Sequence, residues 1–309
     1  MSDGSCSFSF ELFPPRSEKA RDSLLDTIGI LAATRPDFIS VTYGAGGSSR
    51  ESSLELLRHI RSSTAVEPMA HLTCVGSSHD QANRLVREFL DAGVSSFLAV
   101  RGDPPAGTAE GEEFLGDLKT ASELVQLIHR VQKDRAQYAT VRSQISAGGH
   151  LRDAKPKVRV AVAAFPNGHP RSRRLGQDID VLLAKQTSGA TMAITQLFFH
   201  AADYLEFADA AKNAGVTIPI VPGLMPVTSP ARLSRILELS GEREPMQLAQ
   251  RLIGAETAEQ QFEIGVEFST ALAADVLSGG APSLHLYTHN QHQAVLSVLN
   301  GVGALTQRI

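Results

Sequence analysis

Eight short runs of apolar and β-branched residues recur along this chain, and they restrict its fold more than any other feature. Most are followed by a stretch in which apolar residues return at three- and four-residue spacing, the period of an amphipathic helix. We predict strands at 7–12, 37–43, 68–75, 96–102, 157–164, 192–198, 218–224 and 283–288. The predicted helices are 18–33, 49–62, 79–92, 117–134, 173–188, 201–214 and a longer helical stretch over 229–278.

This alternation predicts an α/β fold with a closed sheet. Eight parallel strands close into a (β/α)8 TIM barrel, whereas six would favour a doubly wound open sheet. No internal repeat, linker or low-complexity segment marks a domain boundary, so we expect a single domain over 1–309. The hydrophilic stretch 133–156 is longer than a βα connection requires, and we expect it to be an exposed insertion.

Composition narrows the class of protein. With 42% hydrophobic and 20% charged residues the chain can bury a sizeable core, and no segment approaches the ~20 apolar residues that cross a bilayer. The first ten residues lack the basic start and apolar run of a signal peptide. The two cysteines, Cys6 and Cys74, have no metal-ligand spacing. We therefore expect a cytoplasmic protein with no membrane partner and no metal site.

The charge distribution gives one local signal. A net charge of −4 is no reason to expect nucleic acid as a partner. Arg171, Arg173 and Arg174 form a basic cluster with His169. This cluster suits an anionic ligand such as a phosphate, or it is a solvated helix face.

Polar residues gather where the predicted strands end. In a parallel barrel all these ends face one mouth, which is where such enzymes place their catalytic groups. Ordinary loop-start residues are the alternative interpretation for any single position. The polar residues at these ends are Glu11, Thr42, Tyr43, His71, Thr73, Arg101, Asp103, His169, Gln196, Tyr287 and Asn290, and the apolar or small residues Gly102, Phe165, Met225 and Pro226 lie among them.

The common nucleotide and hydrolase motifs are missing from the sequence. It contains no G-x-G-x-x-G at a helix start, P-loop, nucleophile elbow or H-E-x-x-H. The glycine-rich segment 44–49 follows a predicted strand and precedes a predicted helix. Its backbone suits a phosphate cradle or a plain tight turn.

Three polar residues stand out as chemical candidates. Glu11 lies between apolar neighbours, and burial raises the pKa of a carboxyl group, as a general acid near neutral pH requires; a structural pair with an arginine is the alternative. Asp103, stiffened by two following prolines, suits the edge of an amino-pyrimidine or an ion pair with Arg101. The Gln196 amide suits a heterocycle edge or buried backbone groups.

Eight separated motifs carry a resemblance to a known family. FSFELFPPR, SVTYGAGG, HLTC, AVRGDPP, FPNGHP, AITQLFF, VPGLMPV and HLYTHN follow one another across residues 8–290. The series resembles the catalytic domain of the methylenetetrahydrofolate reductase family, in its bacterial form. The resemblance implies non-covalent FAD, reduced by NADH or NADPH and reoxidised by 5,10-methylenetetrahydrofolate in a ping-pong cycle that supplies methyl groups for methionine synthesis. It also implies a homo-oligomer.

The resemblance assigns roles to individual residues. Glu11 is implied to be the general acid that helps to open the folate ring, Asp103 to lie near both flavin and pterin, and Gln196 to contact folate. The implied FAD contacts are Thr42, His71, Arg101, Gly102, Asp103, Phe165, His169, Ser172, Asp178 and Lys185.

The chain departs from the family pattern at five positions. Phe165 and Phe114 replace aromatic hydroxyls, and Val181 and Ala184 replace polar residues, so contacts to FAD are lost. Gln291 stands where an arginine often follows the asparagine of the last motif, which leaves the folate glutamate tail without its usual partner. A barrel that runs the same reaction oxidatively and a non-catalytic folate-binding subunit are the alternative functions. The sequence does not distinguish NADH from NADPH or from a ferredoxin donor.

Overall fold

The strands form a single parallel sheet that curves into a barrel. The computed structural model describes residues 6–15, 17–42, 50–104, 107–108, 113–145, 157–170, 172 and 174–305. Within them the strands are β1 Phe8–Leu12, β2 Phe38–Val41, β3 Glu67–Thr73, β4 Ser96–Val100, β5 Arg159–Ala164, β6 Met192–Thr195, β7 Ile220–Val221, β8 Gly223–Leu224 and β9 Leu284–Tyr287. Their order is β7-β6-β5-β4-β3-β2-β1-β9-β8, with every strand pair parallel. The predicted (β/α)8 fold class is confirmed.

The seventh predicted strand, 218–224, is divided in two by Pro222. β7 pairs with β6 on one side, and β8 pairs with β9 on the other. Proline has no amide hydrogen, so the ladder cannot run through this position. The barrel therefore closes through the continuous chain between β7 and β8. Side chains reinforce this seam, because the Tyr287 hydroxyl donates to the Thr195 carbonyl at 2.8 Å and the Gly223 amide donates to Thr195 Oγ1 at 2.9 Å.

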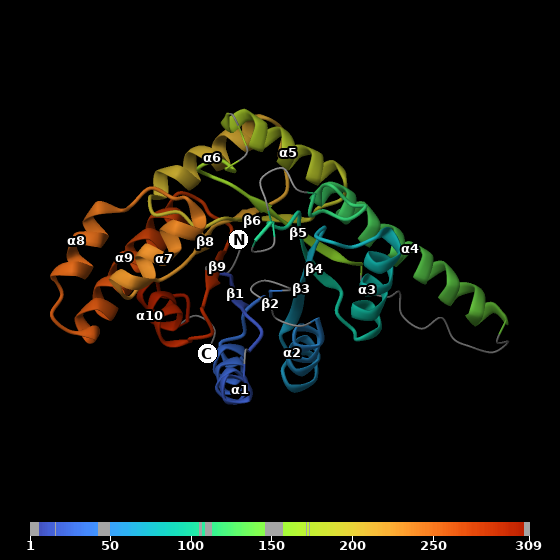
Figure 1. Ribbon diagram of the computed structural model, residues 1–309, viewed down its shortest axis with the longest axis horizontal. Helices are drawn as coiled ribbons and strands as arrows, with labels where there is room; N and C mark the ends of the chain where they lie inside the picture. The colour runs from blue at the N-terminus through green and yellow to red at the C-terminus, as the bar shows by residue number, and fades with distance from the viewer. Residues whose placement is uncertain are drawn as a thin grey trace.

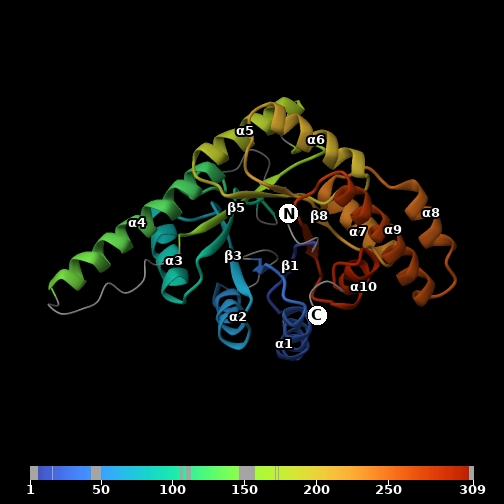
Figure 2. The ribbon, with the colours of Figure 1, turned by 180° about the vertical axis from the view of Figure 1, so that it is seen from behind.

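Helices form the outer layer around the strands (Figure 1). They are α1 Glu18–Ala33, α2 Arg50–Ser63, α3 His79–Asp91, α4 Ala121–Ile145, α5 Leu175–Thr187, α6 Ala201–Asn213, α7 Pro230–Ser240, α8 Met246–Gly254, α9 Ala258–Ser278 and α10 Gln293–Gly301. Viewed from behind, α7 to α10 gather on one flank and α4 extends beyond the other (Figure 2). The predicted stretch 229–278 is thus three helices, and α10 was not predicted.

The region expected to be an exposed insertion, 133–156, is helical in its first half. Residues 133–145 continue α4, which is longer than the predicted helix 117–134. Lys133 and Asp134 are exposed on it. Residues 146–156 lie outside the described part of the chain.

Side-chain alternation along the strands separates the two faces of the sheet. Phe8, Phe10 and Leu12 of β1 are fully buried in the large cluster between strands and helices. The residues between them, Ser9 and Glu11, therefore face the barrel interior. A smaller cluster with residues from β2 to β7 fills the apolar part of that interior: Phe38, Met69, Leu98, Ala161, Met192, Ile194 and Val221. The interior thus has an apolar wall and, at β1, a polar one.

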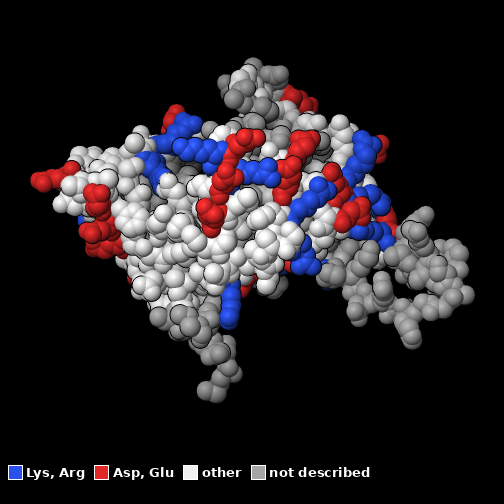
Figure 3. All heavy atoms as spheres, turned by 90° about the horizontal axis from the view of Figure 1, so that it is seen from below, with Lys and Arg blue, Asp and Glu red and all other residues white. Residues whose placement is uncertain are grey.

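The surface carries both signs of charge. On the face seen from below, acidic and basic side chains alternate along one band, and a broad neighbouring area carries neither (Figure 3). Among the described residues, none of the helices is long and apolar enough to span a membrane.

Candidate active site

The carboxyl ends of the strands bring the predicted site residues to one mouth of the barrel. This follows from the parallel order, because each strand ends at the same edge of the sheet. Glu11, Thr42, His71, Arg101, Gly102, Asp103, Phe165, His169, Ser172 and Gln196 end or directly follow β1 to β6, and Asp178 and Lys185 join them from α5. Tyr43, the glycine-rich segment 44–49, Arg171 and Arg173 lie outside the described residues.

A buried carboxylate lies between two imidazoles. Glu11 is 7% exposed, and its Oε2 lies 3.4 Å from His71 Nε2 and 3.6 Å from His285 Nε2. These are ion-pair distances, longer than a well-formed hydrogen bond. On its other side, His285 Nδ1 is 2.8 Å from Ser9 Oγ, and its ring stacks on Phe38. The polar wall is therefore a chain of groups from Ser9 through His285 and Glu11 to His71.

The pKa of Glu11 differs from the sequence expectation. Burial raises the pKa of this carboxyl group, but His71, His285 and His289 together lower it further, so the net shift is downward. Burial also lowers the pKa of His71, against the opposing effect of Glu11. The expectation that burial would leave Glu11 with a raised pKa is therefore wrong for the free protein. Glu11 is a carboxylate near neutral pH, and its neighbours hold it in that form.

Five buried polar side-chain atoms have no hydrogen-bond partner within the described residues: Ser40 Oγ, Thr42 Oγ1, His71 Nε2, Asp178 Oδ2 and His285 Nε2, of which the two imidazole nitrogens face Glu11 at ion-pair distance. Thr42 Oγ1 lies at the end of β2 and Asp178 Oδ2 on α5, both at the mouth. Leaving a buried polar atom unpaired costs about 1–3 kcal/mol, so such atoms at an open mouth point to a ligand. Both residues are among the implied FAD contacts.

Asp178 and Lys185 organise the loop after β5. Asp178 Oδ1 accepts from Ser172 Oγ at 2.7 Å and from the His169 amide at 3.3 Å. Lys185 Nζ donates to the Ala163 carbonyl at 2.7 Å. Burial lowers the pKa of Lys185 to about 8, although Asp178 favours the charged form. An ammonium group beside a carboxylate suits a ligand that carries both anionic and polar atoms.

Aromatic rings extend this part of the mouth. Phe165 contacts His169 edge to face at 4.7 Å between ring centroids, and Lys185 Nζ lies 5.9 Å from the centre of the Phe165 ring. Burial lowers the pKa of His169, and the neighbouring Arg101 adds to that shift. Phe165 carries no hydroxyl group, so it offers a flat ligand an apolar face without a hydrogen bond.

The turn after β4 is built around Gly102. Its φ of +85° is left-handed, and a Cβ would lie 2.5 Å from Val75 Cγ2, so only glycine fits. Arg101 stacks over the Phe114 ring at 5.5 Å. Asp103 is exposed on this turn.

Gln196 is partly committed to the backbone. Its Oε1 accepts from the Leu197 amide at 3.0 Å, which leaves the side-chain NH₂ group as the donor available at the mouth. The residue is partly exposed at the end of β6. Gln196 can therefore donate to a heterocycle acceptor, and its Oε1 retains one lone pair for a second donor.

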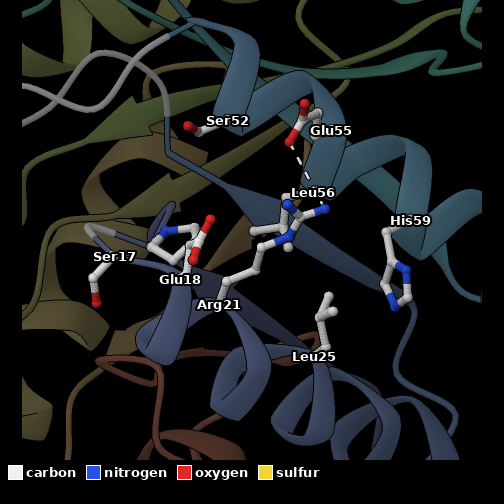
Figure 4. A pocket seen from close by; sticks show the side chains of 9 residues that line it. Ser17, Glu18, Arg21, Leu25, Ser52, Glu55, Leu56 and His59 are labelled. Atoms are coloured by element: carbon white, nitrogen blue, oxygen red, sulfur yellow. Dashed lines mark ion pairs between the residues drawn. The ribbon is translucent and has the colours of Figure 1, made fainter.

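A separate cavity of about 290 Å³ lies on the outer wall between α1 and α2, and the predicted site residues are not part of its lining (Figure 4). Arg21 and Glu55 face each other across it at 4.0 Å. Both side chains are more than half exposed, so this pair contributes little binding energy.

Sequence reasoning missed Ser9, His285 and Arg232. Ser9 and His285 lie within β1 and β9, and the sequence prediction considered only residues at the ends of strands. The signal was present in FSFEL and SLHLY, where polar residues occupy alternate positions and so share the inner face. Arg232 lies in the first turn of α7, and its Nη2 donates to Gln291 Oε1 at 3.3 Å. Only the fold brings these two segments together.

Comparison with known proteins identifies relatives over the whole chain. A family model described as methylenetetrahydrofolate reductase matches residues 1–303. The 5,10-methylenetetrahydrofolate reductase of Escherichia coli K12 is 29% identical over 301 residues, 97% of this chain and 92% of that protein. A probable methylenetetrahydrofolate reductase (NADH) of Oryza sativa subsp. japonica is 29% identical over 99% of this chain. The chain spans about half of that relative, 49% of its length.

Solved structures share the fold at low identity. A protein from Clostridium thermocellum that binds two copies of 5-methyl-5,6,7,8-tetrahydrofolic acid has a TM-score of 0.59 at 14% identity, with 97% of this chain and 94% of that chain covered. A dihydropteroate synthase from Stenotrophomonas maltophilia has a TM-score of 0.52 at 12% identity, covering 99% and 95%. The family model spans all the motifs of the mouth, and the chain belongs to the methylenetetrahydrofolate reductase family.

Proposed function

We propose that this protein reduces 5,10-methylenetetrahydrofolate to 5-methyltetrahydrofolate, with non-covalent FAD at the barrel mouth and NADH or NADPH as the electron donor. Membership of the family and the folate reductases among its relatives support this reaction. The observation that carries the proposal is the buried Glu11 carboxylate between His71 and His285 at the mouth. A folate-binding protein without catalysis would have no need of a buried acid held by two imidazoles.

The residues at the mouth fit a flavin. The unpaired Thr42 hydroxyl and Asp178 oxygen, the Lys185 ammonium group and the apolar Phe165 ring offer the donors, acceptors and flat contact that FAD requires. Gly102 allows the left-handed turn after β4 that carries Arg101 and Asp103. When bound, FAD supplies hydride transfer, and the protein supplies orientation and electrostatics.

Glu11 is proposed as the general acid toward folate. As a carboxylate in the free protein, it must first gain a proton, and the adjacent imidazoles are the groups that can exchange one with it. A bound substrate covers the mouth and removes water, which favours the neutral carboxylic acid. Glu11 would then donate its proton to the folate nitrogen that leaves when the five-membered ring opens. Asp103 and Gln196 would orient the pterin by hydrogen bonds.

The Glu11→Gln variant tests this role. We expect flavin reduction by NAD(P)H to survive, because that half-reaction needs no proton from Glu11. Folate reduction should fall by ~10²-fold or more, the usual effect of losing a general acid. The two half-reactions are measured separately by anaerobic stopped-flow absorbance of the flavin.

Glu67→Gln is the matched control. Glu67 lies at the opposite end of β3, where its Oε1 accepts from Ser95 and Ser96 at 3.2 Å each. Both half-reactions should be unchanged in this variant. Equal losses of both half-reactions in Glu11→Gln would refute the assigned role, and purified protein that binds no flavin would refute the proposed reaction.

Several finer properties belong to this proposal. A cytoplasmic homo-oligomer that follows ping-pong kinetics and supplies methyl groups for methionine synthesis is the form expected from the family. The soluble fraction of a cell lysate, the mass in solution and initial-rate patterns with both substrates test these properties in turn.

A further inference from the structure

The loop after β5 is anchored at two points of the mouth. At the first, the His169 amide donates to the buried Asp178 on α5 at 3.3 Å. At the second, nearer the surface, Asn167 Nδ2 donates to Asp203 Oδ2 in the first turn of α6 at 3.1 Å and to Glu242 Oε2 at 2.7 Å. The first anchor lies among the proposed flavin contacts, whereas the second has no role in the reaction described so far.

The amide of Asn167 holds two groups of like charge. Both of its partners are carboxylate oxygens, which only accept hydrogen bonds, so the NH₂ group faces them and supplies one hydrogen to each. Burial raises the pKa of Glu242 and Asp203 adds to that shift, while the bond from Asn167 and the nearby His200 oppose it. Hydrogen bonds to an ionised acceptor are stronger than those between neutral groups. Asn167 therefore joins two carboxylates that would otherwise repel each other.

Asn167 also lies in the turn that separates two rings of the mouth. The Gly168 amide donates to the Phe165 carbonyl at 3.1 Å, which makes 165–168 a β-turn with Asn167 at its third position. Phe165 begins this turn and His169 follows it, and their rings contact edge to face at 4.7 Å between centroids. A displacement of Asn167 would therefore move both rings.

Glu242 belongs to a different part of the mouth. It lies in the segment between α7 and α8, the two helices that follow β8 and precede α9. These helices pack on the loop after β6 in an apolar cluster of their own, which contains Leu197, Phe199, Leu233, Ile236, Leu248 and Leu252. The loop after β6 begins with Gln196, which is proposed to orient the pterin. The contact between Asn167 and Glu242 thus links the flavin side of the mouth to the folate side.

We propose that Asn167 is a positioning residue that holds Phe165 and His169 in place by coupling the loop after β5 to the α7–α8 segment through Glu242. Asp203 is the second acceptor of the same amide. The assignment of the two rings to a flavin rests on the proposed function, whereas the coupling of the two segments does not. Asn167 acts through its neighbours, so its loss should weaken flavin binding and leave the chemical step nearly unchanged.

Hydrogen exchange of the ligand-free protein tests the coupling. The amides of Gly168 and Glu242 both donate hydrogen bonds, one in each of the coupled segments. Asn167→Ala should raise the exchange rates of both amides by about 5-fold or more, the effect of losing one net hydrogen bond. Asn83→Ala is the matched control. It removes an asparagine on α3 whose Oδ1 accepts from Arg87 Nε at 2.7 Å, and it should leave both rates unchanged.

Titration with FAD, followed by its absorbance, tests the positioning. Asn167→Ala should raise the Kd for FAD by about 5-fold or more, while kcat at saturating FAD stays within about 2-fold. Asn167→Asp should raise the Kd further, because it brings three carboxylates together.

A double variant distinguishes positioning from a general loss of stability. Asn167→Asp combined with Glu242→Gln restores one amide and two carboxylates, with the amide and one carboxylate in exchanged places. It should return the Kd for FAD to within about 2-fold of the wild-type value. A substitution that merely loosened the fold would not be rescued by this exchange.

The outcomes separate this inference from the proposed function. Unchanged exchange at the Glu242 amide in Asn167→Ala would overturn the coupling and leave the reductase standing. An unchanged Kd for FAD in that variant, or a double variant that recovers no affinity, would overturn the positioning role. Faster exchange in both segments of Asn167→Ala, in a protein whose wild type binds no flavin, would uphold the coupling and remove the proposed reaction.

Discussion

Replacing Lys185 by methionine should stabilise the ligand-free protein near neutral pH. Lys185 is 8% exposed on α5, and burial lowers its pKa from 10.5 to about 8. Each unit of difference corresponds to about 1.4 kcal/mol, so folding disfavours the charged side chain by about 3 kcal/mol. Methionine has a similar length without the charge. It loses the hydrogen bond to the Ala163 carbonyl, worth about 1 kcal/mol, which leaves a net gain of about 2 kcal/mol.

The pH dependence of this gain has a definite sign. Below about pH 8 both folded and unfolded wild type carry the proton, and the full penalty is present. Between about 8 and 10.5 the unfolded chain binds more protons at Lys185 than the folded protein does, so wild-type stability rises with pH. The advantage of the Lys185→Met variant should therefore be largest at pH 7 and shrink toward pH 10.

Urea unfolding of the ligand-free proteins at pH 7 and at pH 9.5 measures both effects. Lys212→Met, at an exposed lysine in the last turn of α6, is the control and should show neither the gain nor its pH dependence. The reasoning would be refuted if Lys185→Met were less stable than wild type at pH 7, or if its advantage were the same at both pH values. Because the buried charge serves a ligand in this proposal, the variant should also lose affinity for FAD.

Two further substitutions test the geometry of the mouth. Gly102→Ala should destabilise the fold by about 3 kcal/mol in urea unfolding, since it combines a left-handed φ with a Cβ placed 2.5 Å from Val75; Val75→Ala in the same chain should recover part of this loss, and no recovery would contradict the steric argument. Tyr287→Phe removes the hydroxyl that bonds the Thr195 carbonyl at 2.8 Å and should lower the unfolding free energy by about 1 kcal/mol, so an unchanged value would mean that this bond does not brace the seam.

The barrel could be predicted because strand periodicity and helix periodicity alternate along the sequence. The prediction of strand boundaries failed where a boundary depends on one residue without a backbone amide hydrogen. Pro222 divides the seventh strand through its missing amide hydrogen, although the residues around it read as one apolar run. Helix α10 was overlooked although Val295, Val298 and Leu299 recur at helical spacing, because no predicted strand follows it.

The sequence could predict candidate site residues only where they lie at the carboxyl ends of strands. Glu11 and His71 were chosen as candidates in this way, and the structure brings His71 Nε2 to 3.4 Å from Glu11 Oε2. The direction of the Glu11 pKa shift was beyond the sequence, since it depends on three histidines from distant segments that converge on one carboxylate. Arg232 could not be predicted either. Nothing in the sequence distinguishes it from other helical arginines, and only the fold brings it into contact with Gln291.

The division of the seventh strand has a consequence for how this barrel can move. The strand pairings on either side of Pro222 join only two residues each, fewer than in any other strand pair of the described sheet. The sheet is therefore least strongly hydrogen-bonded there. This part of the sheet lies between β6, which leads to Gln196, and β9, which leads to the loop with the left-handed residues His289 and Asn290. A fluctuation that loosens the wall would therefore widen the mouth on the side proposed for folate, while the continuous ladders from β1 to β6 keep the flavin side in register. In the proposed enzyme, substrate exchange and retention of the cofactor would then fall to different parts of one sheet.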